Sequence, residues 1–130
     1  MKLHILVFSL CLLCLMKLTA CTNAEPSYTR ISGEEAHRMM QGSGDFILLD
    51  VRTYEEFRER RIEGAVLIPQ NEIASRAANE LPDKDVIILI YCRSGRRSEM
   101  AANELIAMGF TNVYDFGGIE TDWSFETVSG

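Results

Sequence analysis

The feature that most constrains the fold is an apolar run, Val86 to Ile90, that leads directly into a cysteine and a basic loop. Four of its five residues are β-branched, and the residues before it are polar. A run of this length without a polar position predicts a strand buried on both faces, as in a parallel sheet covered by helices. Tyr91 and Cys92 continue the run, so we expect the cysteine at the carboxyl end of a central strand.

The residues that follow Cys92 predict an anion-binding loop. The segment 93–97 contains three arginines, a serine and a glycine, and a helix is predicted from Ser98 to about Met108. Ligands of open α/β sheets bind at the carboxyl ends of the strands. A helix start also supplies unpaired N–H groups and the positive end of the helix dipole. We therefore expect the thiol to lie in an electropositive site, where thiols ionise more readily.

The rest of the chain, from residue 28 onward, alternates between strand and helix patterns. The other predicted strands are 28–31, 46–51, 65–68 and 112–116, the last broken by Gly117-Gly118. The other predicted helices are 32–40, 53–60 and 71–81. Capping boxes mark the starts of the first two helices, Ser32 with Glu35 and Thr53 with Glu56. This alternation predicts the α/β class, with a parallel sheet covered by helices on both faces.

The first 20 residues predict a signal peptide of the lipoprotein type. Lys2 gives a positive start, residues 5–16 are almost wholly apolar, and Leu18-Thr19-Ala20-Cys21 resembles the lipobox of bacterial lipoproteins. Cleavage is then expected before Cys21, whose thiol would carry lipid. The apolar span is shorter than the roughly 20 residues of a transmembrane helix. An ordinary secretory signal and an uncleaved anchor are the alternatives.

The predicted organisation is a signal peptide over 1–20, a linker over 21–27 and a domain over 28–130. We expect the protein to be exported and held by its lipid on the outer face of the bacterial cell membrane. Without the lipid it would be periplasmic or secreted.

The net charge and the cysteine content limit the kinds of partner that we expect. The chain of 130 residues has a net charge of −6, and removal of Lys2 and Lys17 would make it −8, which argues against nucleic acid as a partner. Cleavage would also remove Cys11 and Cys14, leaving Cys92 as the free thiol of the mature domain. A single exported thiol indicates a chemical use, and a redox partner protein would keep it reduced.

A set of short motifs occurs in one order along the chain. They are Asp50-Val51-Arg52, Glu56-Phe57, Gly64-Ala65, Tyr91 to Ser98, and Gly117-Gly118-Ile119 with Trp123. Together they resemble a single-domain rhodanese over about residues 27–123. The resemblance implies a three-layer fold with a five-stranded parallel sheet, and sulfur transfer through a persulfide on Cys92.

The chain departs from this family before the third strand. Members usually have a Gly-His-Ile-Pro-Gly-Ala pattern, and here residues 60–65 read Arg-Arg-Ile-Glu-Gly-Ala, with Arg61 in the place of the histidine. We expect the change to affect a local contact rather than the chemistry. Asp50 should accept a hydrogen bond from Arg61 or from Arg52, and all three are assigned a structural role near the site.

The loop chemistry points to a thiolate that attacks an anionic sulfur donor. A free cysteine has a pKa near 8.5, so only about 3% is thiolate at pH 7. Convergent N–H groups and fixed positive charge would stabilise the anion. Cys92 is the expected nucleophile, and the expected substrate-binding residues are Arg93, Ser94, Gly95, Arg96, Arg97 and Ser98, with Arg93 and Arg97 favoured over Arg96. Thiosulfate would donate sulfur, and cyanide or a thiol would accept it. No cofactor and no metal ligand are expected.

Two other classes share parts of this pattern. Cysteine-based phosphatases or arsenate reductases of the same fold are one alternative. Cysteine phosphatases carry an arginine six positions after the cysteine, where this chain has Ser98, and phosphatases of this fold have a loop one residue longer. A non-catalytic persulfide carrier or partner-binding module is the other alternative, and the presence of Cys92 is compatible with a carrier.

Overall fold

The computed structural model describes residues 24–81 and 83–130. The predicted signal peptide and the lipidation site Cys21 lie outside these residues. Within the described residues, no helix is both long enough and apolar enough to cross a bilayer.

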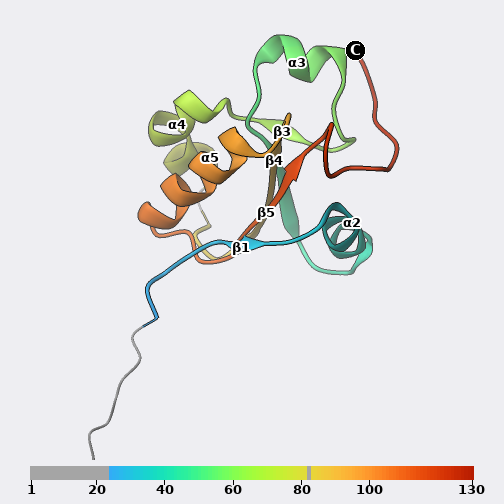
Figure 1. Cartoon of the computed structure of the whole chain (residues 1–130). Helices are drawn as coiled ribbons and strands as arrows, with labels where there is room; N and C mark the ends of the chain where they lie inside the picture. Colours follow the sequence, from blue (N-terminus) through green and yellow to red (C-terminus); the bar gives the residue numbers. More distant parts are fainter. Residues whose placement is uncertain (1–23, 82) are drawn as a thin grey trace, which may run out of the picture.

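The described residues form an α/β fold, as predicted. Its strands are β1 (Thr29–Arg30), β2 (Phe46–Asp50), β3 (Val66–Leu67), β4 (Ile87–Cys92) and β5 (Val113–Gly118). Its helices are α2 (Gly33–Gln41), α3 (Tyr54–Glu59), a 3-10 turn (Gln70–Glu72), α4 (Ile73–Glu80) and α5 (Arg96–Ala107). The strands make one five-stranded parallel sheet in the order β1-β5-β4-β2-β3, so β4 lies at its centre (Figure 1).

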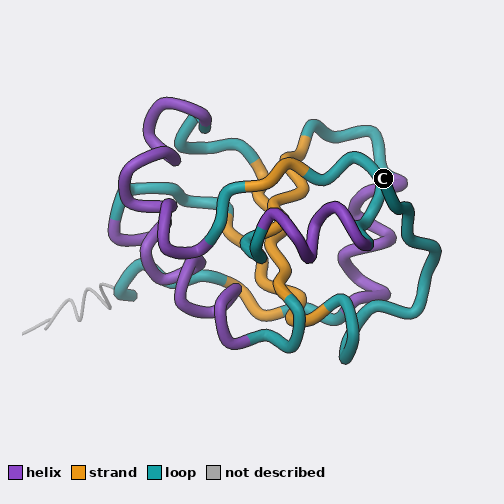
Figure 2. Tube along the Cα trace, turned by 90° about the horizontal axis from the view of Figure 1, so that it is seen from above, coloured by secondary structure: helices purple, strands orange, loops and turns teal. Residues whose placement is uncertain are grey.

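The central strand shows why the apolar run leads to a three-layer fold. Ile88, Ile90 and Cys92 pack into the cluster that α4 and α5 cover, whereas Leu89 and Tyr91 pack into the cluster that contains Ala36 of α2. All five strand residues are at most 1% exposed. Alternate side chains of a strand point to opposite faces, so an uninterrupted apolar run buries both. Figure 2 shows the strands lying between the two helical layers.

Most element boundaries differ from the sequence prediction by one or two residues, and three of the changes alter the kind or the extent of an element. The helix after the cysteine begins at Arg96 rather than at Ser98, because Gly95 adopts a positive φ of 103° and its carbonyl oxygen accepts the first helical hydrogen bond from Glu99. Strand β5 continues through Gly117-Gly118 instead of breaking there, since Gly118 pairs with Cys92 beyond a register shift. The helix predicted over 71–81 opens with the 3-10 turn before α4.

A buried ion pair closes the carboxyl end of β2. Asp50 is 0% exposed and the Arg52 side chain 4%. The Asp50 carboxylate accepts hydrogen bonds from Arg52 Nε at 3.0 Å and Nη2 at 2.7 Å, and from the Arg52 backbone N–H at 2.9 Å. Arg52 Nη2 also donates to the Arg60 carbonyl oxygen at 2.5 Å. Of the two donors considered for Asp50, the structure therefore uses Arg52.

Arg61 serves a different part of the molecule. Its guanidinium donates to the backbone oxygens of Phe57 at 3.3 Å and Gly130 at 2.7 Å, and lies over the Phe57 ring at 4.8 Å. Its backbone exchanges two hydrogen bonds with Val128. Arg61 thus attaches the C-terminal segment to α3, which lies at the end of the sheet where β5 finishes (Figure 1).

We predict that Arg52→Ala destabilises the protein far more than Arg61→Ala. Loss of Arg52 leaves the Asp50 carboxylate buried without its partner, which costs about 3–5 kcal/mol. Loss of Arg61 removes partly exposed contacts and costs about 1–2 kcal/mol. Urea denaturation at pH 7 measures both free energies of unfolding. Equal losses, or a larger loss for Arg61→Ala, would contradict this assignment of the two arginines.

Candidate active site

The site is built around the sulfur of Cys92 at the carboxyl end of β4. The residue is 1% exposed. The Gly95 backbone N–H points at the sulfur, with 3.0 Å between N and Sγ, and Ser98 Oγ lies 3.6 Å from it. Gly95 itself has a positive φ of 103°, a conformation that side chains disfavour, and leads the chain from the loop into α5. The structure therefore brings the expected nucleophile Cys92 together with Gly95 and Ser98, two of the expected substrate-binding residues.

The loop is fixed by its contact with the end of β5. The Ile119 N–H donates to the Cys92 carbonyl oxygen at 2.8 Å, and the Glu120 N–H donates to that of Arg93 at 3.1 Å. At Gly118 the backbones approach so closely that a Cβ would lie 2.6 Å from Ser94 Cα. Glycine is therefore needed at position 118, because a larger residue would push the loop away.

A second network of charged residues fixes the Gly117-Gly118 backbone by accepting its N–H groups. The buried Asp115 accepts hydrogen bonds from Gly117 N at 2.9 Å and from Arg30 Nη1 at 3.0 Å. Asp122 accepts from Gly118 N at 2.8 Å. The sequence analysis missed Arg30, Asp115 and Asp122. The available signal was an aspartate inside an otherwise apolar strand, which indicates a buried carboxylate with fixed partners.

The arginines of the loop have three different environments. Arg97 makes a two-pronged pair with Glu56 of α3, at 2.7 Å and 2.8 Å. Arg93 lies 3.4 Å from Glu120, and both side chains are more than half exposed. Arg96 is exposed, as is Ser94. The two exposed arginines can meet an incoming anion, whereas Arg97 is already bound to a carboxylate.

The Glu56–Arg97 pair changes the ionisation of both residues. The hydrogen bonds from Arg97 lower the pKa of Glu56 to about 2, against the opposing effect of burial. The same bonds raise the pKa of Arg97. Glu56 also caps its own helix by accepting from the Thr53 N–H at 2.9 Å, which is the capping box that the sequence predicted. Both residues stay charged at neutral pH, so α3 and the cysteine loop are joined.

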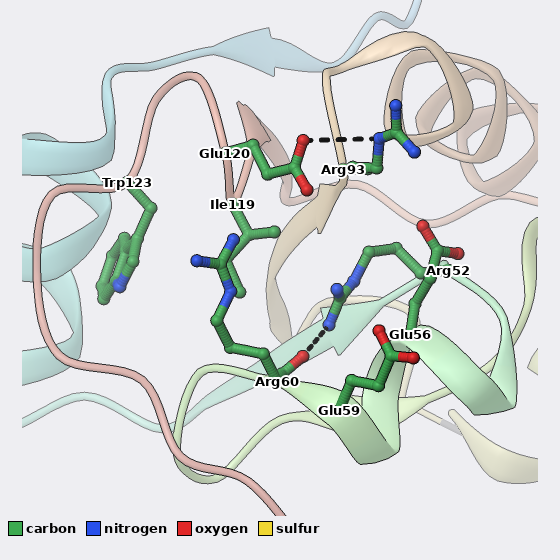
Figure 3. A pocket seen from close by; sticks show the side chains of 8 residues that line it. All are labelled: Arg52, Glu56, Glu59, Arg60, Arg93, Ile119, Glu120 and Trp123. Atoms are coloured by element: carbon green, nitrogen blue, oxygen red, sulfur yellow. Dashed lines mark hydrogen bonds and ion pairs between the residues drawn. The ribbon is translucent and has the colours of Figure 1, made fainter.

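A pocket of about 610 Å³ opens beside the loop (Figure 3). Its lining residues are Arg52, Glu56, Glu59, Arg60, Arg93, Ile119, Glu120 and Trp123. They come from the end of β2, from α3, from the cysteine loop and from the segment after β5. Charges of both signs face the pocket, and Ile119 and Trp123 add apolar surface.

The chain is similar to known sulfur-transfer proteins. The model of the rhodanese-like domain matches residues 32–124. The thiosulfate sulfurtransferase PspE of Escherichia coli is 38% identical over 82 residues, covering 63% of this chain and 78% of PspE. The putative sulfur carrier protein YrkF of Bacillus subtilis is 40% identical over 101 residues, covering 78% of this chain and 54%, about half, of YrkF. A solved structure, a rhodanese with anions from E. coli, has a TM-score of 0.61 and 35% identity, covering 66% of this chain and 100% of the other.

We predict that Glu56→Gln lowers the free energy of unfolding at pH 7 by about 2 kcal/mol. The pKa of Glu56 is lower in the folded protein than in an unfolded chain, so the ionised carboxylate stabilises the fold. The contribution is full above pH 4.5, the ordinary value, and is lost as the pH falls toward 2. The urea midpoints of wild type and Glu56→Gln should therefore approach each other as the pH is lowered from 4.5 toward 2. Glu55→Gln, an exposed neighbour on α3, is the matched control. A wild-type advantage that persists unchanged at pH 2 would contradict the argument.

Proposed function

The chain belongs to the rhodanese-like domain family, and on that premise we propose that it is an enzyme of the thiosulfate sulfurtransferase type, with Cys92 carrying the transferred sulfur. The observation that carries the proposal is the Gly95 N–H directed at Cys92 Sγ from 3.0 Å, at the carboxyl end of the central strand. A backbone donor of this kind favours the negative charge of a thiolate and of the persulfide that replaces it.

In the first half-reaction the Cys92 thiolate attacks the outer sulfur of thiosulfate. A new S–S bond forms, the S–S bond of thiosulfate breaks, and its electron pair leaves with sulfite. The enzyme keeps a persulfide anion, so the total charge is conserved. The thiolate is the attacking form, so the bond-forming step itself needs no general base. The exposed Arg93 and Arg96 are the cations that an incoming dianion meets first.

In the second half-reaction a thiophilic acceptor attacks the outer sulfur of the persulfide. Cyanide would take up this sulfur and dissociate as thiocyanate. A thiolate acceptor would take it up and dissociate as its own persulfide. In both cases the S–S bond to Cys92 breaks and its electron pair returns to Sγ. The thiolate is restored without an oxidant or a reductant.

The loop gives less support to a phosphatase or an arsenate reductase. The position six residues after Cys92 is Ser98, which is buried and lies 3.0 Å from the Gly95 carbonyl oxygen. The arginine one residue earlier, Arg97, is held by Glu56. Transfer of a phosphoryl group needs fixed cations around its equatorial oxygens, and this loop places none at that position.

We predict that thiosulfate adds one sulfur atom, about 32 Da, to the protein and that cyanide removes it. Cys92→Ser should abolish the addition, as intact mass spectrometry would reveal. An unchanged wild-type mass, together with hydrolysis of an aryl phosphate, would favour the phosphatase. A loaded persulfide that cyanide and small thiols discharge only slowly would favour a carrier that hands sulfur to a protein.

We also propose that the protein is an exported lipoprotein anchored through Cys21. The positive start, the apolar stretch and Leu18-Thr19-Ala20-Cys21 support the proposal. Seven residues, 22–28, separate Cys21 from β1. At no more than about 3.6 Å per residue, such a linker would keep the domain within roughly 25 Å of the lipid. The acceptor would then be a molecule available at the membrane surface.

We predict that Cys21→Ala leaves an unprocessed precursor that does not incorporate radiolabelled palmitate. The cysteine is the only lipid attachment point in this scheme, and stable anchoring takes more than one acyl chain. Gel mobility and membrane fractionation of both proteins measure the effect. Equal labelling of wild type and Cys21→Ala would refute the lipobox assignment.

A further inference from the structure

We infer that the pocket beside the cysteine loop binds the acceptor, and that its preferred acceptor is a small thiol carrying both an ammonium and a carboxylate group. This rests on the proposed sulfur transfer and specifies the second substrate. Thiosulfate and cyanide need little space, whereas about 610 Å³ lies within the range of roughly 300–1,000 Å³ of small-molecule sites. The pocket is therefore large enough for an amino acid or a short peptide.

Two of the charged residues in the pocket are already neutralised by strong partners. Arg52 is bound to Asp50, and Glu56 is bound to Arg97. Arg93 and Glu120 face each other at 3.4 Å across exposed surface. Their contact is exposed and weak, and it offsets part of the charge on that wall.

Arg60 and Glu59 are the remaining charges. Among the described residues, neither side chain makes an ion pair. In Figure 3 the Arg60 guanidinium extends toward Ile119, and the Glu59 carboxylate lies on the side of Glu56. The pocket thus offers one uncommitted cation and one uncommitted anion. A ligand with a carboxylate for Arg60 and an ammonium for Glu59 would satisfy both, whereas a ligand of one sign would meet repulsion from the other.

The position of the pocket suits the second half-reaction. Arg93, in its wall, directly follows Cys92, whose sulfur is buried. In a persulfide the reacting atom lies about 2 Å from Sγ, the length of one S–S bond. The acceptor thiolate would attack this outer sulfur, the bond to Cys92 Sγ would break, and the electron pair would return to Sγ. The acceptor leaves as its persulfide.

The experiment measures discharge of the persulfide by four thiols. Protein loaded with thiosulfate and freed of excess donor is mixed with cysteine, 3-mercaptopropionate, cysteamine or 2-mercaptoethanol, and loss of about 32 Da is followed by mass spectrometry. These probes carry both charges, the carboxylate alone, the ammonium alone, and neither. For each thiol the wild-type rate is divided by the variant rate, which cancels the intrinsic reactivity of the thiol.

Arg60→Gln should slow cysteine and 3-mercaptopropionate about fivefold, the effect of a partly exposed ion pair, and leave the other two thiols unchanged. Glu59→Gln should slow discharge of the persulfide by cysteine and by cysteamine by a similar factor. Discharge by 3-mercaptopropionate and by 2-mercaptoethanol should be unchanged. Arg58→Gln and Glu55→Gln, exposed changes on the same helix but outside this pocket, should slow none. Loading by thiosulfate should be normal in every variant.

Equal ratios for all four thiols, whether near one or uniformly raised, would overturn the inference. A rate effect that ignores the charge of the acceptor means that Arg60 and Glu59 do not recognise its head group. Wild-type protein that takes up no sulfur would instead refute the proposed function, and the acceptor site with it. The two failures are therefore distinguishable.

Discussion

The close approach of the cysteine loop to the end of β5 is the constraint on which the site depends. Cys92 and Arg93 accept backbone hydrogen bonds from Ile119 and Glu120, and only a glycine at 118 permits this distance. Because the two segments are held together, the loop has one shape, and the Gly95 N–H is directed at the sulfur before any substrate arrives. Preorganised donors of this kind need no rearrangement when charge develops.

Ion pairs fasten the surrounding elements to this loop at different depths. The Asp50–Arg52 pair is buried and closes the end of β2, while Glu56–Arg97 is partly exposed and ties α3 to the start of α5. Such pairs have a desolvation cost, so their value lies in fixing positions as much as in net stability. A consequence for chemistry is that Arg97 enters the reaction cycle already bound, and Arg93 and Arg96 remain to attract an anion.

Helix α3 links the proposed acceptor pocket to the rest of the fold. Its first turn holds Arg97 through Glu56, and its last turn presents Glu59 and then Arg60. The C-terminal segment holds the same helix through Arg61, one of the residues at which this chain departs from the usual family pattern. This departure from the family pattern therefore affects residues that support the pocket, and it leaves the cysteine loop unchanged.

The sequence alone determined the α/β class, the buried central strand and the cysteine at its carboxyl end, because an uninterrupted β-branched run and helix caps are local signals. It also named Gly95 and Ser98 among the expected substrate-binding residues, and the structure places both beside the sulfur. It did not reveal that Arg97 is bound by Glu56, 41 positions away, or that Arg30 supports Asp115, 85 positions away. Only the tertiary structure decided which charges are paired and which face the pocket, because those pairings depend on strand order and on the packing of α3, which no local pattern encodes.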